Sequence, residues 1–298
     1  MQDSPDVPHA LDEAAAQPST VEAGWGWYLY GIVGSGQDMT EALRAVASVA
    51  LEEGERPVEA VASDGLAAIV RRVPLADYAP EALRARAEDP AWIEAVARHH
   101  NVVVEAIHTA QTILPAQFGA VYPHAEDVRA ALLEERDALL ERLAWLRDCD
   151  EWGVRLYGDV AAIQRAAAEQ ESVRRLREEL ASASRGRAYL LERKLADELA
   201  VSAERLVDDL VDRAYDHMSR HTKARLLNRR LAGARIRDNS EQSAELAYAT
   251  FLTPRASTDA FIADVRASAE SQPGLWCEYS GPWPPYSFAA ALGKDEEG

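Results

Sequence analysis

The pattern of hydrophobic and polar positions divides the chain into two parts, each with strand and helix segments in turn. In the first part, the aromatic and β-branched run Trp27–Val33 predicts a buried strand. The following residues predict, in order, a helix over Thr40–Leu51, strands over Val58–Ala62 and Leu66–Val73, a helix over Trp92–His108 and an edge strand over Leu114–Tyr122. This βαββαβ order predicts a ferredoxin-like first domain over residues 24–122, in which two helices cover one face of an antiparallel sheet.

The second part, residues 123–288, begins with an amphipathic helix over Glu126–Arg147, which we expect to link two domains. Further segments are predicted in this order: a strand over Trp152–Tyr157, helices over Val160–Ala181 and Tyr189–Ser219, strands over Arg229–Ile236 and Leu246–Leu252, a helix over Asp259–Ser271 and a strand over Leu275–Ser280. Leucines at eleven-residue steps in the second long helix favour a helical hairpin or a short coiled coil. The sequence therefore predicts an α+β protein with two domains, the C-terminal one carrying a long helical hairpin insertion.

The two ends of the chain lack periodicity. Residues 1–23 predict a disordered acidic tail and residues 289–298 a second disordered tail, because neither has enough apolar residues to offset the entropy of ordering. The first segment also lacks the basic and apolar regions of a secretion signal. Cys149 and Cys277 have no metal-site or disulfide-framework spacing, which favours a reducing compartment. We therefore expect a cytoplasmic protein.

The charge of the chain limits its partners. A net charge of −18 repels nucleic acid phosphates and anionic lipid headgroups, and no apolar run reaches the roughly 18 residues of a membrane span. We therefore expect neither nucleic acid nor a membrane as a partner. One run, Arg220–Arg237, holds seven lysine and arginine residues and no acidic residue, and it includes Arg229 and Arg230. It is interpreted either as a face that pairs with this chain's own carboxylates or as a site for an acidic protein partner.

Some glycines and histidines of the chain have spacings close to those of ligand-binding motifs. Gly31, Gly34 and Gly36 follow a strand, but their GxxGxG spacing differs from the dinucleotide fingerprint, so a glycine-rich turn is favoured. His217 and His221 stand one helical turn apart without the glutamate of a metalloprotease motif. They continue the apolar stripe of their helix and are interpreted as half-buried packing residues.

Two further groups of titratable residues stand out: His99, His100 and His108 on one helix, and Asp148, Asp150 and Glu151 around Cys149. The histidines are interpreted as a solvated or partly packed helix face, because no nucleophile or metal motif accompanies them. The acidic residues are interpreted as a charged turn between helix and strand. The sequence thus predicts no catalytic residue, no metal site and no cofactor, and the protein is not expected to be an enzyme.

Three segments resemble the gas vesicle L/F family: the opening strand WYLYGIV, the block Leu114–Tyr122, and the ending Gly281–Phe288, GPWPPYSF. The segment Gly186–Leu190, GRAYL, is similar to the one that opens the family's long helix. The resemblance extends over about Trp25 to Phe288. It implies an accessory role in building gas vesicles, in which the protein binds the small hydrophobic shell protein. It also allows an alternative, a minor structural component permanently built into the vesicle wall, and it admits other gas vesicle accessory proteins as partners.

The ending GPWPPYSF provides candidate interaction residues. Its prolines favour an extended backbone that presents Trp283, Tyr286 and Phe288. These aromatic rings either pack onto their own domain and lock the last strand or contact a partner protein. Together with Arg229 and Arg230, they are the residues predicted to contact another protein.

Overall fold

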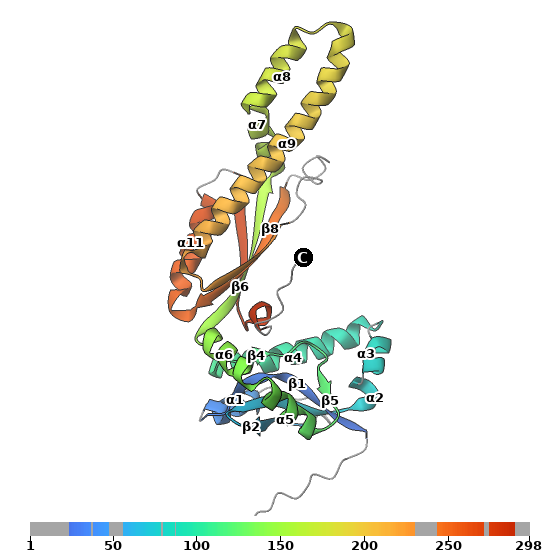
Figure 1. The fold of residues 1–298 in the computed structure, drawn as a ribbon, viewed down its shortest axis with the longest axis vertical. Coiled ribbons are helices and arrows are strands. Elements are labelled where there is room, and N and C mark those ends of the chain that lie inside the picture. The colour runs from blue at the N-terminus through green and yellow to red at the C-terminus, as the bar shows by residue number, and fades with distance from the viewer. Residues whose placement is uncertain are drawn as a thin grey trace, which may run out of the picture.

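The structure is a computed structural model that describes residues 24–36, 38–47, 56–78, 80–86, 88–229, 243–270 and 274–289. Both predicted tails, except Ala289, and most of the predicted strand Arg229–Ile236 lie outside these ranges. The described chain is a mixed helix-and-sheet fold in which two antiparallel sheets lie one beyond the other along an elongated molecule (Figure 1). None of its described helices combines the length and the apolar composition of a membrane span.

The first sheet has the strand order β2-β3-β1-β4, and β5 also pairs with β1. Its strands are β1 (Trp25–Gly34), β2 (Val58–Ser63), β3 (Leu66–Pro74), β4 (Leu114–Pro115) and β5 (Val121–Tyr122). The predicted single edge strand over Leu114–Tyr122 is wrong, because the chain leaves β1 after Pro115 and returns at Val121. Proline donates no ladder hydrogen bond, and Gly119, at φ +84°, turns the intervening loop.

Helices cover both faces of the first sheet. On one face lie α1 (Asp38–Ala47) and α4 (Pro90–Ala110), whose Val103, Val104 and Ile107 are buried against the sheet. Two short helices, α2 (Leu75–Tyr78) and α3 (Pro80–Arg86), connect β3 to α4. The continuous buried run of β3 is consistent with two covered faces, since a strand with one solvated face would alternate.

The predicted linking helix over Glu126–Arg147 is instead two helices that belong to the first sheet. They are α5 (Ala125–Glu134) and α6 (Arg136–Leu146), and they meet at Glu135, where φ is −102° and ψ is 12°. Val128 and Leu143 pack in one cluster with Leu29 and Val70 of the sheet. Their amphipathic stripe therefore covers the second face of the sheet, because that face is apolar too.

The second sheet has the strand order β7-β8-β6-β9. When the strands of each sheet are numbered along the chain from one to four, both sheets have the same order, 2-3-1-4. Its strands are β6 (Cys149–Asp159), β7 (Ala224–Arg229), β8 (Ser243–Pro254) and β9 (Leu275–Trp283). The strand predicted from Arg229 onward in fact begins at Ala224, inside the basic run. Helices α9 (Arg185–Met218) and α11 (Thr258–Glu270) cover one face, where Val211 and Phe261 pack on Phe251 and Leu156.

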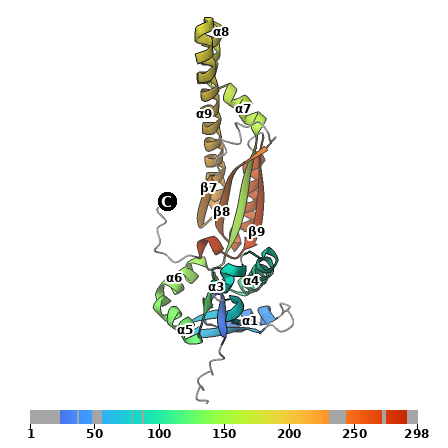
Figure 2. The same ribbon diagram turned by 90° about the vertical axis from the view of Figure 1, so that its right-hand side faces the viewer.

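A helical arm projects from the second sheet. The predicted helix over Val160–Ala181 is divided into α7 (Val160–Ala168) and α8 (Glu171–Ala181), and α8 packs antiparallel on the first half of α9. Val173, Leu176 and Leu191 are buried between them. We call α8 and the part of α9 before Ala203 the arm, and both views show it rising beyond the end of the sheet (Figures 1 and 2). Short 3-10 turns, η1 (Ser219–His221), η2 (Arg255–Ser257) and η3 (Tyr286–Phe288), complete the fold.

Candidate functional site

The aromatic ending lies between the two sheets and its three rings have different surroundings. Phe288 is 7% exposed, packs in the cluster shared by both sheets, and has its ring centroid 6.4 Å from that of Trp145. The backbone N–H and the hydroxyl of Ser287 donate to the carboxylate of Glu151, each at 2.7 Å. For Phe288 the packing alternative is therefore the one observed.

Tyr286 and Trp283 are less enclosed. The hydroxyl of Tyr286 donates to Asn101 Oδ1 of α4 at 3.1 Å, and burial raises the pKa of this phenol. Trp283 is 42% exposed, and its indole N–H donates to Ser280 Oγ at 3.2 Å. Of the three predicted aromatic contacts, Trp283 is the most exposed, Tyr286 is 37% exposed and bonded to α4, and Phe288 is buried.

The basic residues of the predicted site are only partly described. Arg229 ends β7, where its backbone pairs with Ala247, while Arg230 lies outside the described residues. Nearby, Arg225 makes an ion pair with Asp216 at 2.9 Å and covers the ring of Tyr215. At this position the basic run pairs with the chain's own carboxylate, and a contact of Arg229 or Arg230 with another protein stays a prediction.

A buried polar cluster joins the two sheets. The predicted charged turn around Cys149 is correct for the exposed Asp148, which lies between α6 and β6, but wrong for Asp150 and Glu151, which lie inside β6. Asp150 lies inside β6 and is buried. His108 Nε2 of α4 lies 2.8 Å from Asp150 Oδ1, and Arg255 Nε of η2 donates to the same oxygen at 2.9 Å. Arg255 also donates from Nη2 to the backbone oxygen of His108 at 2.7 Å. We call His108, Asp150 and Arg255 the joint.

Hydrogen bonds and nearby charges explain how the carboxyl groups of Asp150 and Glu151 can be buried. Burial alone would raise the pKa of Asp150, but the hydrogen bonds from His108 and Arg255 and the charge of Arg255 outweigh it and lower that pKa. For Glu151, burial outweighs the two bonds from Ser287, so its pKa is raised. The difference arises because Asp150 has a cationic partner and Glu151 accepts from neutral donors.

The histidines of α4 are more buried than a solvated helix face allows. His100 lies 2.9 Å from the hydroxyl of Tyr28 through Nδ1, and burial lowers its pKa to about 4, so it is neutral at pH 7. A sequence signal for this existed. His100 and His108 follow the buried residues Val96 and Val104 at four-residue steps, which places them on the same helix face.

One face of the second sheet is not covered by any helix in the described ranges. The strand register defines three rows of neighbouring residues across this face. The first row is Leu226, Thr250, Gly153 and Ser280, the second is Tyr248, Arg155 and Glu278, and the third is Tyr157 and Trp276. The alternating residues Val154 and Leu156 point to α9 and α11 instead. We call the group Leu226, Tyr248, Arg155, Tyr157, Trp276 and Trp283 the open face.

The open face is unusually apolar for an exposed surface. Leu226 is 49% exposed and Trp276 is 37% exposed. The ring of Trp276 stacks on Tyr157 at a centroid distance of 5.6 Å, and the hydroxyl of Tyr157 donates to Glu278 at 3.2 Å. These contacts hold the rings in fixed positions, as a protein-binding surface requires.

The glycine Gly31 of the GxxGxG segment has a packing role. It lies at an irregularity of β1, and a Cβ there would stand 2.6 Å from the backbone oxygen of Leu114 and 2.7 Å from Ile113. We expect Gly31→Ala to reduce the free energy of unfolding by about 1–3 kcal/mol, because the backbone of β4 must move. Denaturant unfolding measures this. Gly34→Ala is the matched control, since a Cβ there meets nothing within 4 Å; equal effects of the two changes would contradict the explanation.

His217 and His221 face a carboxylate that sequence analysis did not identify. Their Nε2 atoms lie 3.5 Å and 3.7 Å from the two oxygens of Asp264 in α11. His217 is half-buried near the end of α9, as predicted, whereas the prediction is wrong for His221, which lies in η1 with 46% of its side chain exposed. No group of three or more histidine, cysteine or acidic side chains within the described part of the chain could hold a metal ion.

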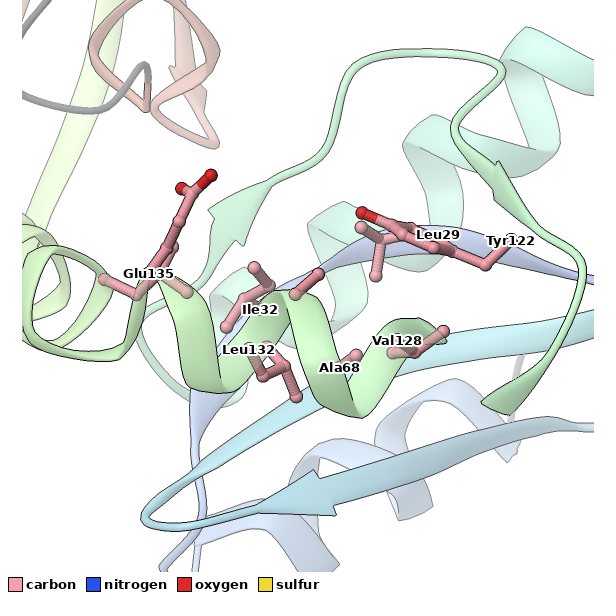
Figure 3. A pocket seen from close by; sticks show the side chains of 9 residues that line it. Leu29, Ile32, Ala68, Tyr122, Val128, Leu132 and Glu135 are labelled. Carbon is pink, nitrogen blue, oxygen red and sulfur yellow. The ribbon is translucent and has the colours of Figure 1, made fainter. Parts of the chain in front are cut away.

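Two cavities of the described chain have few reactive groups among their lining residues. Figure 3 shows a pocket of about 80 Å³ between the first sheet and α5, lined by Leu29, Ile32, Tyr122 and Val128, with Glu135 as the sole carboxylate among its described lining residues. A wider cleft of about 450 Å³ near the joint is lined by Ser35, Gln111, Arg147 and Arg255. Arg255 is already bonded to Asp150 there. Neither space brings a nucleophile to a matched base, as catalysis would need.

The model of one protein family matches residues 26–290, under the description gas vesicle synthesis protein GvpL/GvpF. The chain belongs to the GvpL/GvpF family. Among its GvpL/GvpF relatives, gas vesicle protein L of Streptomyces sp. (strain CB03234) is 30% identical over 246 residues, 81% of this chain and 86% of that protein. Gas vesicle protein F of the same strain is 28% identical over 263 residues, 88% of this chain and 98% of that protein.

Two solved GvpF structures share the fold of this GvpL/GvpF member. The crystal structure of GvpF from Microcystis aeruginosa has a TM-score of 0.57 at 18% identity and covers 89% of this chain and 99% of its own. GvpF from Anabaena sp. PCC7120 has a TM-score of 0.60 at 17% identity and covers 90% of this chain and 98% of its own. The mixed helix-and-sheet architecture is thus common to these proteins over nearly their whole length.

Proposed function

We propose that this chain is a gas vesicle accessory protein that binds the small hydrophobic shell protein and assists vesicle assembly. Membership of a family of gas vesicle synthesis proteins supports a role in gas vesicle formation. The observation that carries the finer proposal is the open face, where Leu226, Trp276 and Trp283 stay exposed on a sheet backed by α9 and α11. A shell subunit with a gas-facing apolar surface needs such a cover in water.

The chemistry of the open face suits an apolar partner that must later be released. Tryptophan supplies much of the binding energy in many interfaces, and Trp276 and Trp283 are held by stacking and by a hydrogen bond. Arg155 and Glu278 are exposed between the aromatic rings. These charges keep the free surface soluble and limit the affinity, because a partner has to desolvate them.

The remaining features of the proposal rest on the charge and composition of the chain and on its family. The protein acts in the cytoplasm and at the gas vesicle, with other gas vesicle accessory proteins as further partners and without nucleic acid, membrane, cofactor or catalytic step. Arg229, the last residue of β7, and Arg230, which follows it in the sequence, provide additional contacts. We also infer a ferredoxin-like first domain that extends through α6, since α5 and α6 pack on its sheet, followed by a second α+β domain with the arm as an insertion.

Replacing Trp276 and Trp283 by Ala tests the shell-protein contact. We expect each change to weaken binding by about 2 kcal/mol, roughly thirtyfold, while the melting temperature changes little because both rings are partly exposed. Co-purification and titration with the shell protein measure this. Leu133→Ala, at a 53% exposed position on α5, is the matched control and should bind normally. Unchanged binding in the double tryptophan variant would remove the open face from the proposal.

Deleting the gene in a vesicle-forming host tests the assembly role. Fewer or misshapen vesicles are expected, provided that no related gene compensates. Normal vesicles after deletion, together with no binding of the shell protein in vitro, would contradict the proposal. If the protein instead stays with washed, intact vesicles at a fixed ratio, the alternative of a permanent minor wall component is favoured.

A further inference from the structure

The tip of the arm carries the two most exposed large hydrophobic side chains of the described chain. Tyr189 is 70% exposed and Leu190 is 66% exposed. They lie in the second turn of α9, next to the turn between α8 and α9 at the top of Figure 1. Their neighbour Leu191 is buried against α8, so the apolar residues needed to hold the arm together are already supplied without them.

The geometry of α9 brings these side chains into one outward surface. Along α9, Tyr189 and Leu190 each lie three or four residues from Gly186 and from Arg193. Residues at that spacing lie on one side of a helix, so these four share the face opposite Leu191. A Cβ on Gly186 would meet nothing within 4 Å. Gly186 therefore leaves exposed backbone one turn before the two apolar side chains, and another helix can approach closely there. We call Gly186, Tyr189, Leu190 and Arg193 the tip patch.

The tip patch is electropositive, although the whole chain has a net charge of −18. The first ten residues of α9 contain four basic residues and one acidic residue, Glu192. Arg187 is paired with Glu179 of α8 at 3.5 Å, while Arg185, Arg193 and Lys194 have no ion-pair partner in the part of the chain that is described. The N-terminal end of α9 adds the positive end of a helix dipole.

The position of the tip patch separates it from the open face. Packing of α9 in the core of the second sheet begins at Ala203, so the tip patch, which lies 10 to 17 residues earlier, is roughly 15–25 Å beyond that point at 1.5 Å per residue. A protein bound to the open face therefore leaves the tip patch free. Exposed apolar side chains beside unpaired cations, on a projecting arm, are typical of a contact with a second protein.

We propose that the tip patch is a docking site for an acidic amphipathic helix of another protein. Apolar side chains of that helix cover the exposed backbone at Gly186 and contact Tyr189 and Leu190, and its carboxylates pair with Arg193 and Arg185. Charge complementarity favours an acidic partner, because the tip patch is basic. The open face presents mainly aromatic rings and gives no such preference. The arm thus holds a second protein while the open face binds the first.

Fluorescence anisotropy with the full-length chain tests this docking. The probe is a labelled synthetic helical peptide with leucines on one face and glutamates beside them, and the comparison peptide has lysines in place of the glutamates. We expect the glutamate peptide to bind at least tenfold more tightly than the lysine peptide, with an affinity that falls as salt is raised. Tyr189→Ala with Leu190→Ala should reduce binding at least tenfold, and Arg193→Glu severalfold, without loss of folding because these side chains are exposed.

The controls separate the possible occupants. Leu133→Ala and the Trp276 and Trp283 variants should bind the glutamate peptide normally, so failure of the open-face proposal leaves this one testable. Equal binding of both peptides, no binding of either, or full binding by the Tyr189 and Leu190 double variant would overturn the proposal. So would concentration-dependent dimerisation that the double variant abolishes in sedimentation, because the occupant would then be a second copy of this chain.

Discussion

Asp150→Ala is expected to reduce the free energy of unfolding by about 3 kcal/mol, which is one of the two largest effects we anticipate in this molecule. The change leaves His108 buried without its carboxylate and removes the partner of Arg255 at the same time. The estimate is taken from the low end for buried pairs, because Arg255 is 38% exposed and water screens part of its charge. Chemical denaturation of the full chain measures the effect.

The pH dependence provides a second test of the joint. The pKa of folded Asp150 lies below its ordinary value, so its stabilising contribution is present above about pH 4 and is lost as the pH falls through the lower, folded pKa. The difference in stability between the wild type and Asp150→Ala should therefore shrink below about pH 4. Asp148→Asn is the matched control at an exposed neighbour whose positive φ asparagine tolerates. A difference that stays constant down to pH 3 would contradict a charged joint.

Phe288→Ala is expected to reduce the free energy of unfolding by about 3–4 kcal/mol, since the ring is buried between the two sheets. It packs in one cluster with Leu146, Cys149 and Leu252, which come from both sides of the molecule. Loss of the ring opens a cavity at the contact between the sheets. Thermal unfolding and calorimetry should show either one lower transition or two separated ones, as the sheets lose their coupling.

Trp283→Ala serves as the comparison for this second effect. Its ring is 42% exposed, so the loss of stability should stay below about 1 kcal/mol even though the side chain is larger. If Trp283→Ala destabilised the protein as much as Phe288→Ala, the ending would be a structural clamp along its whole length. If neither variant were destabilised, the packing of Phe288 between the sheets would be wrong.

The burial of the polar side chains in the joint cannot be predicted from the sequence, because their partners are distant along the chain. Asp150 lies 42 residues from His108 and 105 residues from Arg255. A cluster such as Asp148, Asp150 and Glu151 is usually solvated, and only the pairing of β6 in the second sheet buries Asp150 and Glu151. Composition gives no sign of such burial, because it depends on which cations the fold brings near. The spacing of His100 and His108 behind buried valines was the available signal.

The helices α5 and α6 show a related limit. Their apolar stripe is visible in the sequence, but the stripe does not say which surface it covers. A ferredoxin-like sheet buries one face only, so the sequence pattern predicts a linking helix here, whereas the structure places α5 and α6 on the second face of the first sheet. The run of buried residues in β3, where no polar position alternates, indicates a sheet with two covered faces.

By itself, the sequence determined the order of nearly all strands and helices, the hairpin that forms the arm, and membership of the gas vesicle family, because periodicity and short motifs are local properties of the chain. Tertiary structure alone decided which of these elements share a core, which charges are buried, and which apolar side chains stay exposed. Phe288 and Trp283 illustrate this, since they lie five residues apart in one aromatic motif, yet one fills the space between the sheets and the other faces solvent. The physical reason is that burial depends on neighbours brought together by the fold, whereas the propensity for a strand or a helix depends on adjacent residues.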